Sequence, residues 1–226
     1  MRHVIRPRED SLARNAGLVP MTGNLFDFDV MKVSVISPAF QARYLENPSS
    51  PGIFEGRAIV FVGGDDFHHR INDPGLAIDA DCILVMRGAG PIGWPGAAEV
   101  VNMQPADALV RAGITSLPTI GDGRQSGTFD SPSIVHASPE SAAGGGLAWL
   151  RTGDTIRVDR NAGRCDALVG NAEIALRQTE PPPIPESRTL WAEIYRAGVG
   201  SLATGAVREA AVKYQRLADR LPRHNH

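Results

Sequence analysis

Glycine and proline divide this chain into short segments, and that division limits the folds that it can adopt. The 226 residues include 24 glycines and 17 prolines. Between them stand short apolar runs rich in β-branched residues, a pattern typical of many short strands. The predicted strands cover 31–37, 57–64, 81–88, 116–123, 131–138, 154–160 and 165–170.

Helices are expected between some of these strands. The predicted helical segments are 40–48, 105–113 and 139–153. In the last of them Ser138 is a candidate N-cap, Pro139 suits the first turn, and Glu140 adds a favourable negative charge there. Residues 161–163 predict the turn of a hairpin. Helices and strands do not alternate regularly, so we expect a strand-rich α/β fold and not a doubly wound sheet.

The composition of the sequence changes near its end. A proline run at 181–183 can continue neither a helix nor a central strand, and indicates a stiff extended connector. We therefore predict a domain over 1–180, a proline-rich linker over 181–187 and a helical tail over 188–226. Apolar side chains recur at helical spacing in the tail, at Val207, Ala211, Tyr214, Leu217 and Leu221. Such a tail is expected to pack on its own domain or on a neighbouring subunit, which favours a homo-oligomer.

Charge and hydropathy exclude several classes of function. The formal net charge is −2 and the pI is about 6.3, so the chain has no general attraction to nucleic acid or to an anionic membrane. The sequence has no apolar run of the roughly 20 residues that a membrane span needs, and no signal peptide is evident. Cys82 and Cys165 lie too far apart in sequence for a zinc or iron–sulfur motif. Free thiols in a reducing cytoplasm are expected.

Three glycine-rich polar segments each adjoin an apolar run, so all three could emerge at one rim of the domain. They cover 21–28, 87–100 and 117–140. Two interpretations stay open: the glycines either end strands, or let backbone N–H groups approach a small anion closely. The middle segment lacks the Lys-Ser/Thr pair of a P-loop, and no helix follows in the register of a dinucleotide site.

Single residues in these segments have alternative interpretations. Glu99 is either a helix-start charge or one oxygen ligand of a hard cation such as Mg²⁺. Ser126 is either a turn hydroxyl or a base that needs a metal or a partner base to ionise it. His136 could be that partner, although a strand histidine with satisfied hydrogen bonds is the expected state. His68 and His69 are adjacent on a predicted strand, point to opposite faces, and are expected at the surface.

The order and content of these segments resemble the C-terminal domain of the dihydroxy-acid and phosphogluconate dehydratase family. The resemblance covers nearly all of residues 1–180, through "TGNLFDFDVMKVSVIS", "FEGRAIVF", "RGAGPIGWPGAAEVVNMQP" and the segment that starts at "ITSLPTIGDGRQSGTFDSPSIVHASPE". The pattern "GDGRQSGT…SPSI…ASPE" is the most specific part. "RGAGPIGWPGAAEV", "GRQSGT" and the closing "AVKYQRLADRLPRHNH" are most similar to the sugar-acid branch, the arabinonate and xylonate dehydratases.

This resemblance implies a β-barrel-like swivelling domain with surrounding helices, in an enzyme of two domains. The implied reaction removes water from a 2,3-dihydroxy carboxylate, and the resulting enol becomes a 2-keto-3-deoxy acid. In the family an iron–sulfur cluster acts on the departing C3 hydroxyl. A Mg²⁺ ion holds the carboxylate and the C2 oxygen, and a serine alkoxide removes the C2 proton.

The family's site residues transfer onto matching positions of this sequence. Ser126 matches the catalytic base, and Glu99 matches the one Mg²⁺ ligand that this domain supplies. His226, at the chain end, matches a terminal histidine near the active site in the sugar-acid branch. Arg124 and Thr128 flank the base and are expected to contact the substrate.

Other parts of the family's site have no match in this sequence. The resemblance assigns the cluster cysteines, a second carboxylate and a carbamylated lysine to an N-terminal domain, and neither Cys82 nor Cys165 falls in a cluster motif. We therefore expect the chain to be inactive alone, as a split subunit or truncated product that needs an N-terminal half. The alternatives are a non-catalytic remnant that binds a sugar acid or pairs with a full-length homologue, and a general swivelling-type ligand-binding domain.

Overall fold

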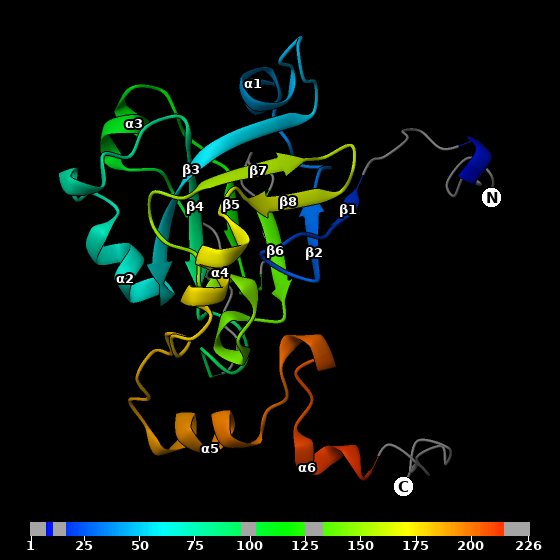
Figure 1. Ribbon diagram of the computed structural model, residues 1–226, viewed down its shortest axis with the longest axis vertical. Helices are drawn as coiled ribbons and strands as arrows, with labels where there is room; N and C mark the ends of the chain where they lie inside the picture. The colour runs from blue at the N-terminus through cyan, green and yellow to red at the C-terminus, as the bar shows by residue number, and fades with distance from the viewer. Residues whose placement is uncertain (1–7, 11–16, 96–102, 125–132, 215–226) are drawn as a thin grey trace, which may run out of the picture.

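The strands of this chain form one mixed sheet that curls almost into a barrel (Figure 1). The computed structural model describes residues 8–10, 17–95, 103–124 and 133–214. The strands are β1 (Leu18–Met21), β2 (Phe28–Lys32), β3 (Ile53–Val62), β4 (Cys82–Arg87), β5 (Thr119–Gly121), β6 (Ser133–Ser138), β7 (Thr155–Asp159) and β8 (Arg164–Ala167). Their order in the sheet is β1-β2-β6-β5-β4-β3-β7-β8. A parallel bridge between Thr22 and Arg164 brings the two edges together, which nearly closes the barrel.

Four neighbouring strands, β3 to β6, are parallel to one another, and the remaining pairs are antiparallel. Parallel strands are usually covered on both faces, which is why their sequences are continuous apolar runs. In β4 Ile83 and Val85 belong to the core inside the barrel, while Leu84 and Met86 belong to a second apolar cluster. One run of sequence therefore serves two cores.

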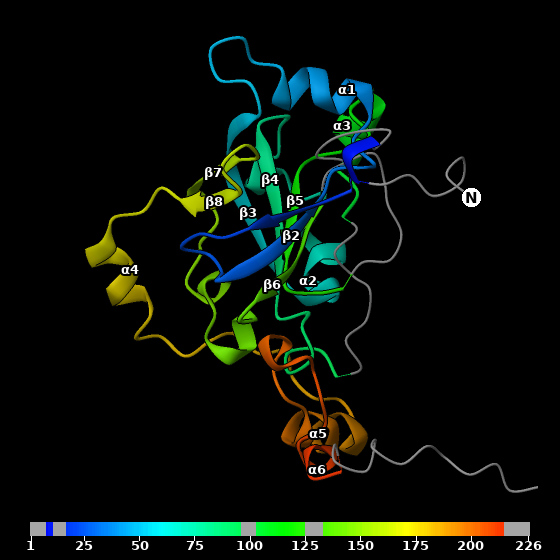
Figure 2. The same ribbon diagram turned by 90° about the vertical axis from the view of Figure 1, so that its right-hand side faces the viewer.

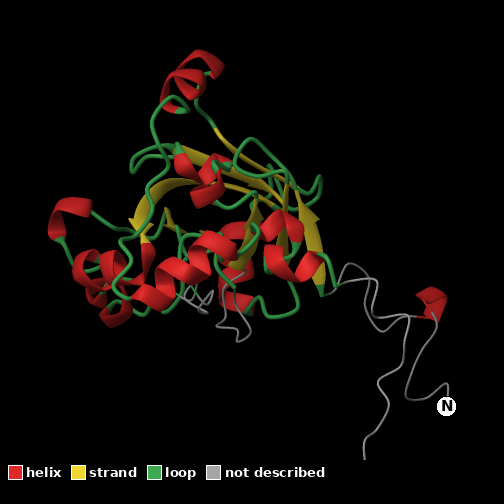
Figure 3. Ribbon diagram, turned by 90° about the horizontal axis from the view of Figure 1, so that it is seen from below, coloured by secondary structure: helices red, strands yellow, loops and turns green. Residues whose placement is uncertain are grey.

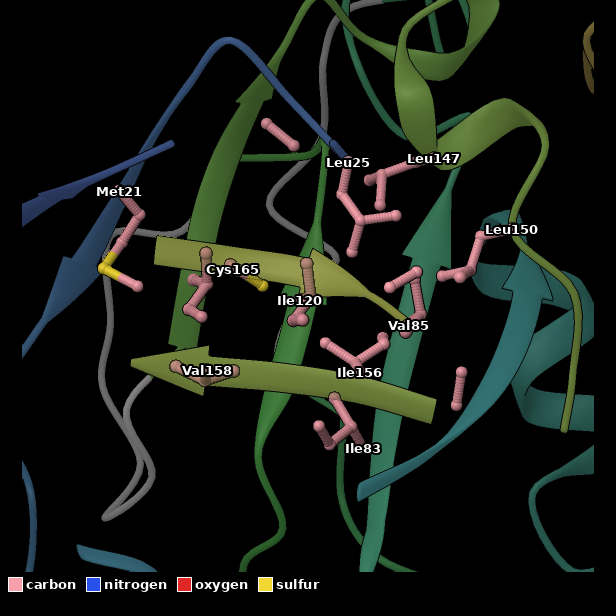
Figure 4. Close-up of a cluster of buried hydrophobic side chains, with 14 of the residues drawn as sticks. Met21, Leu25, Ile83, Val85, Ile120, Leu147, Leu150, Ile156, Val158 and Cys165 are labelled. Carbon is pink, nitrogen blue, oxygen red and sulfur yellow. The ribbon is translucent and has the colours of Figure 1, made fainter. Parts of the chain in front are cut away.

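The larger core fills the barrel. Side chains from β4, β5, β7 and β8 meet there, among them Val85, Ile120, Ile156 and Cys165 (Figure 4). The second cluster lies under α2, where Phe67 packs edge-to-face on Phe61 with ring centroids 5.4 Å apart. These two clusters fix the sheet and leave the loops at its ends to be held by other means.

Short helices and turns surround the strands (Figures 2 and 3). The α-helices are α1 (Pro38–Phe40), α2 (Gly63–Arg70), α3 (Asp107–Arg111), α4 (Asn171–Arg177), α5 (Leu190–Gly198) and α6 (Glu209–Val212). The other helical turns are η1 (Arg8–Asp10), η2 (Gln41–Leu45), η3 (Pro74–Leu76), η4 (Ser141–Ala143), η5 (Gly146–Ala148) and η6 (Leu202–Thr204). Within the described ranges no helix has the length and apolar character to cross a membrane.

The predicted α/β class and barrel-like sheet are confirmed. Each predicted strand overlaps an observed one, although β2 both begins and ends earlier than the predicted 31–37, and β1 was not predicted. The hairpin at 161–163 is confirmed, because β7 and β8 pair antiparallel on either side of it. The predicted helices at 40–48 and 105–113 are also present, as α1 with η2 and as α3.

The helix predicted over 139–153 is wrong. Ser138 is the last residue of β6 and not a cap, and only the two short turns η4 and η5 follow it. Glycine explains the failure: Gly144 has φ +84°, and a Cβ on Gly145 would collide with the carbonyl oxygen of Pro139. The chain must fold back on itself here, which an α-helix cannot do.

The strand predicted for His68 and His69 is also wrong, since both residues lie in α2. Their side chains are exposed, so the expectation that they are surface residues holds for a different reason. The tail contains α5 as expected, and α6 is a short helix within the described residues. Leu217 and Leu221 lie outside those residues, and the division at 181–187 stays a prediction.

Candidate active site

All three glycine-rich segments reach one edge of the barrel, which we call the carboxyl edge. It is formed by the ends of β4, β5 and β6, which run parallel and therefore finish on the same side. The loop at 22–27 reaches the same edge, since Phe28 pairs with Ser138 and the amide of Asp27 donates to the Ser138 carbonyl at 2.9 Å. In Figures 1 and 2 this edge faces down, towards α5 and α6. The described parts of the three segments therefore share one rim.

The predicted site residues are placed only in part. Glu99, Ser126, Thr128 and His226 lie outside the described residues, so their roles stay predictions. The described flanks show where two of the segments start: the Glu99 segment follows β4, and the Ser126 segment follows the neighbouring β5. Arg124 is exposed at the carboxyl edge, two residues beyond Asp122.

Asp122 fastens three loops of this edge together. Its carboxylate is fully buried and accepts backbone N–H groups of Gly88 at 3.0 Å, Ala89 at 2.9 Å and Ser141 at 2.8 Å. The hydroxyl of Ser141 accepts a second bond from the Gly88 amide at 2.8 Å. A buried carboxylate needs such donors, because an unpaired one would be strongly destabilising. Asp122 thus joins the ends of β4, β5 and β6.

Glu140 has a similar role between the barrel and the tail. Its buried carboxylate accepts the amides of Ile92 at 3.0 Å and Gly93 at 3.4 Å through Oε2, and that of Leu202 at 3.1 Å through Oε1. Burial raises the pKa of Glu140, and the bonds from the Ile92 and Gly93 amides oppose that rise. A Cβ on Gly90 would collide with Oε2 of Glu140, so this close approach requires glycine.

His136 occupies an unusual position in β6. Its backbone has φ +71°, a region that side-chain-bearing residues rarely adopt and that is often found at functional sites. Burial lowers the pKa of its imidazole, and the nearby positive charge of Arg124 lowers it further. His136 also lines a hollow of about 440 Å³, together with Asp27, Ser138 and Leu202. His136 therefore lies on a strand, as expected, and borders this hollow.

The sequence did not single out the residues that organise this edge. Asp122 was not assigned a role, Glu140 was interpreted as a helix-start charge, and Arg196 was not considered. The available signal was weak: each acid comes directly or almost directly after a buried strand, where loop amides need acceptors. Pairing with residues 33 to 104 positions away cannot be deduced from spacing.

The described residues do not hold a complete metal site. No group of three or more His, Cys, Asp or Glu side chains suited to a metal occurs among them. Cys82 and Cys165 are free and buried, the first in the cluster under α2 and the second inside the barrel. Burial raises the pKa of both thiols, which disfavours the thiolate that an iron–sulfur cluster needs. Neither cysteine fits a cluster ligand.

Comparison with known proteins identifies the domain. The sequence profile described as "Dihydroxy-acid/6-phosphogluconate dehydratase C-terminal" matches residues 3–206. The D-xylonate dehydratase of Caulobacter vibrioides is 65% identical over all of this chain, which spans 38% of that protein. The L-arabinonate dehydratase of Rhizobium leguminosarum bv. trifolii is 36% identical over 90% of the chain and 34% of its own length.

A third relative extends the match to the other branch. The dihydroxy-acid dehydratase of Clostridium beijerinckii is 35% identical over 90% of the chain, which covers 34% of that protein. The chain thus spans about a third of the length of the curated relatives that it matches. It belongs to the dihydroxy-acid and 6-phosphogluconate dehydratase family, and corresponds to the family's C-terminal domain.

Proposed function

We propose that this chain provides the C-terminal part of the active site of a sugar-acid dehydratase, with D-xylonate or a similar aldonate as substrate. The observation that carries the proposal is the 65% identity to the Caulobacter D-xylonate dehydratase over the whole chain. The identity to the dihydroxy-acid dehydratase is much lower, at 35%. This difference favours a sugar acid over the substrate of the amino-acid branch.

In the proposed reaction Ser126 takes the proton from C2 of the sugar acid, and the C3 hydroxyl leaves as water. The enol that remains becomes a 2-keto-3-deoxy acid by tautomerisation. A serine hydroxyl is a weak base, so it needs a nearby positive charge to ionise. Arg124 and Thr128 are the proposed contacts of the substrate, and His226 is a proposed acid or base at the chain end. The glycines around Ser126 leave space for the substrate beside the hydroxyl.

The proposed cofactors are Mg²⁺ and an iron–sulfur cluster. Glu99 would provide one oxygen ligand of the metal, whose chemistry is to stabilise the negative charge that develops on the substrate. The cluster would be bound by the part of the enzyme that corresponds to the remaining length of the relatives. That part, as a further domain or a separate subunit, is the proposed partner. We also propose a homo-oligomer through the tail, and the cytoplasm as the compartment, since both cysteines are free thiols.

A chimera tests this proposal. The 226-residue chain replaces the matching 38% of the Caulobacter D-xylonate dehydratase, and formation of a 2-keto-3-deoxy acid is measured with D-xylonate and with L-arabinonate. We expect turnover of D-xylonate, and a loss of about 10²–10⁴-fold on Ser126→Ala, the range typical for a general base. Ser49→Ala, at an exposed serine, is the matched control and should keep full activity.

The same assay separates the alternatives. A chimera with normal cluster content and no turnover would contradict the proposal and favour the non-catalytic remnant. If turnover persists in Ser126→Ala, Ser126 is not the catalytic base, although the domain still belongs to an active enzyme. A chain that turns over D-xylonate without any added partner would contradict the proposed need for the rest of the enzyme.

A further inference from the structure

The first residues of the loop after β4 are held from two sides. This loop starts at Gly88 and continues towards the Glu99 segment. Asp122 binds its first two amides, and Glu140 binds the amides of Ile92 and Gly93. The carbonyl oxygens of Ile92 and Gly93 face a different partner, which comes from the tail.

That partner is Arg196 of α5. Its guanidinium donates to the carbonyl of Ile92 at 2.8 Å and to that of Gly93 at 3.0 Å. It also donates to the Pro185 carbonyl at 2.8 Å and to the Ser187 hydroxyl at 2.6 Å. All four bonds involve a charged donor, which makes them stronger than neutral hydrogen bonds. Arg196 is half-buried, so solvent screens these bonds less than it would at the surface.

The two side chains therefore act on the same two residues. Glu140 accepts hydrogen bonds from their N–H groups, and Arg196 donates hydrogen bonds to their carbonyl oxygens. The other oxygen of Glu140 accepts a hydrogen bond from the amide of Leu202 in the tail. We call Glu140, Arg196 and the residues that they share the loop clamp. It ties the loop after β4 to β6 on one side and to the tail on the other.

We propose that Glu140 and Arg196 are positioning residues, which set the path of the loop that leads to Glu99 and so make the helical tail a working part of the active site. The inference rests on the proposed function for its link to catalysis. The physical reason is that a loop without regular secondary structure keeps its geometry only where its polar groups are bound. A group that binds a metal or a substrate loses much of its effect when it is displaced by about 1 Å.

The tail has a second arginine that makes a matched control. Arg188 lies just before α5 and pairs with Asp65 at 2.7 Å, but its side chain is 81% exposed and forms no hydrogen bond with the described residues of the loop after β4. An exposed ion pair contributes little to stability. Arg188→Ala and Arg196→Ala therefore remove the same kind of side chain from neighbouring parts of the tail. The first leaves the loop clamp intact, and the second removes its guanidinium.

The first test uses amide hydrogen exchange on this chain alone, so it does not depend on activity. Arg196→Ala and Glu140→Gln should speed exchange at Ile92, Gly93 and Leu202 by about tenfold or more, because local opening then costs less. Arg188→Ala should change it by less than about twofold. Unchanged exchange in both clamp variants would overturn the inference. Arg196→Lys, which keeps the charge and loses most of the bonds, should fall between and covers the case in which Arg196→Ala does not fold.

The second test uses the chimera with the Caulobacter enzyme. Arg196→Ala should raise the Mg²⁺ concentration for half-maximal rate by about 10–100-fold, the range seen when residues that orient metal ligands are changed. The KM for D-xylonate should change far less. Faster exchange with an unaltered Mg²⁺ requirement and kcat would overturn the positioning role, leaving Arg196 as an anchor of the tail. A wild-type chimera without activity would contradict the proposed function. The exchange experiment alone would then show whether Glu140 and Arg196 hold the loop after β4.

Discussion

The interior of the barrel and its carboxyl edge are both buried, yet they are held by different forces. The interior is filled by apolar side chains such as Val85 and Ile156, whose burial needs no particular partner. At the edge the buried carboxylates of Asp122 and Glu140 each accept three backbone amides. Apolar burial makes the barrel stable, whereas directional bonds define where irregular loops lie. An edge whose loops carry the residues of a proposed active site needs the second kind of control.

The largest effect on stability is expected inside the barrel. Ile156 is fully buried on β7, so Ile156→Ala should lower the free energy of unfolding by about 2–5 kcal/mol, the range for a large core residue cut to alanine. Urea unfolding measures it. Leu176→Ala, at a residue 64% exposed on α4, is the control and should stay within about 0.5 kcal/mol. Equal losses in the two variants would contradict the assigned core.

A smaller effect is expected at the edge. Asp122→Asn keeps the shape but turns one acceptor into a donor that faces backbone N–H groups. The loss should be about 1–3 kcal/mol, the cost of leaving buried donors unpaired. If Asp122 acts locally at the edge, Asp122→Asn should increase hydrogen exchange of the Gly88, Ala89 and Ser141 amides more than that of the amides in β7.

An exposed aspartate provides the control for this change. Asp107→Asn, on α3, alters a side chain that is 64% exposed and should change stability by no more than about 0.5 kcal/mol. Equal exchange of the edge amides in the wild type and in Asp122→Asn would show that Asp122 does not hold these loops together.

The same division explains what the sequence could predict. The apolar runs of β3 and β4 and the turn at 161–163 depend on local patterns, and these elements were predicted. The helix over 139–153 was predicted wrongly, because the close approach of Gly145 to Pro139 depends on packing that no local pattern reveals. Glu140 was misinterpreted for the same reason: its acceptor role involves Leu202, 62 residues away. Glu99 and Ser126 came from the family resemblance and stay predictions.

One carboxylate departs from this comparison, since Asp29 is fully buried on β2 and one of its oxygens has no partner among the described residues. Burial raises its pKa well above the ordinary value, while the bond from the Val30 amide opposes the rise. A carboxyl whose pKa is raised by folding stabilises the fold most below its unfolded pKa, near 3.9, and less as the pH rises towards the folded pKa.

Asp29→Asn removes that titration. The stability of the variant relative to the wild type should therefore increase as the pH rises from about 4 to 8, by an amount that urea unfolding at each pH measures. Asp27→Asn, at an exposed neighbour, should leave the shape of the wild-type profile unchanged. Parallel profiles for the wild type and Asp29→Asn would show that Asp29 does not titrate differently in the folded state, and would contradict the raised pKa assigned to it.

The smallest effect on stability is expected in the tail, where apolar side chains are neither in the interior nor bound at the edge. On α5 Leu190 is 67% exposed and Trp191 is 78% exposed. Trp191→Ser should therefore change the free energy of unfolding of a single chain by less than about 0.5 kcal/mol. Apolar groups left together at a surface are typical of an interface, so the variant should weaken the proposed oligomer in sedimentation measurements. Glu193→Gln on the same helix should leave association unchanged. If wild-type and Trp191→Ser chains sediment alike, the exposed face of α5 is not an oligomer contact. The main structural role of α5 would then be to carry Arg196.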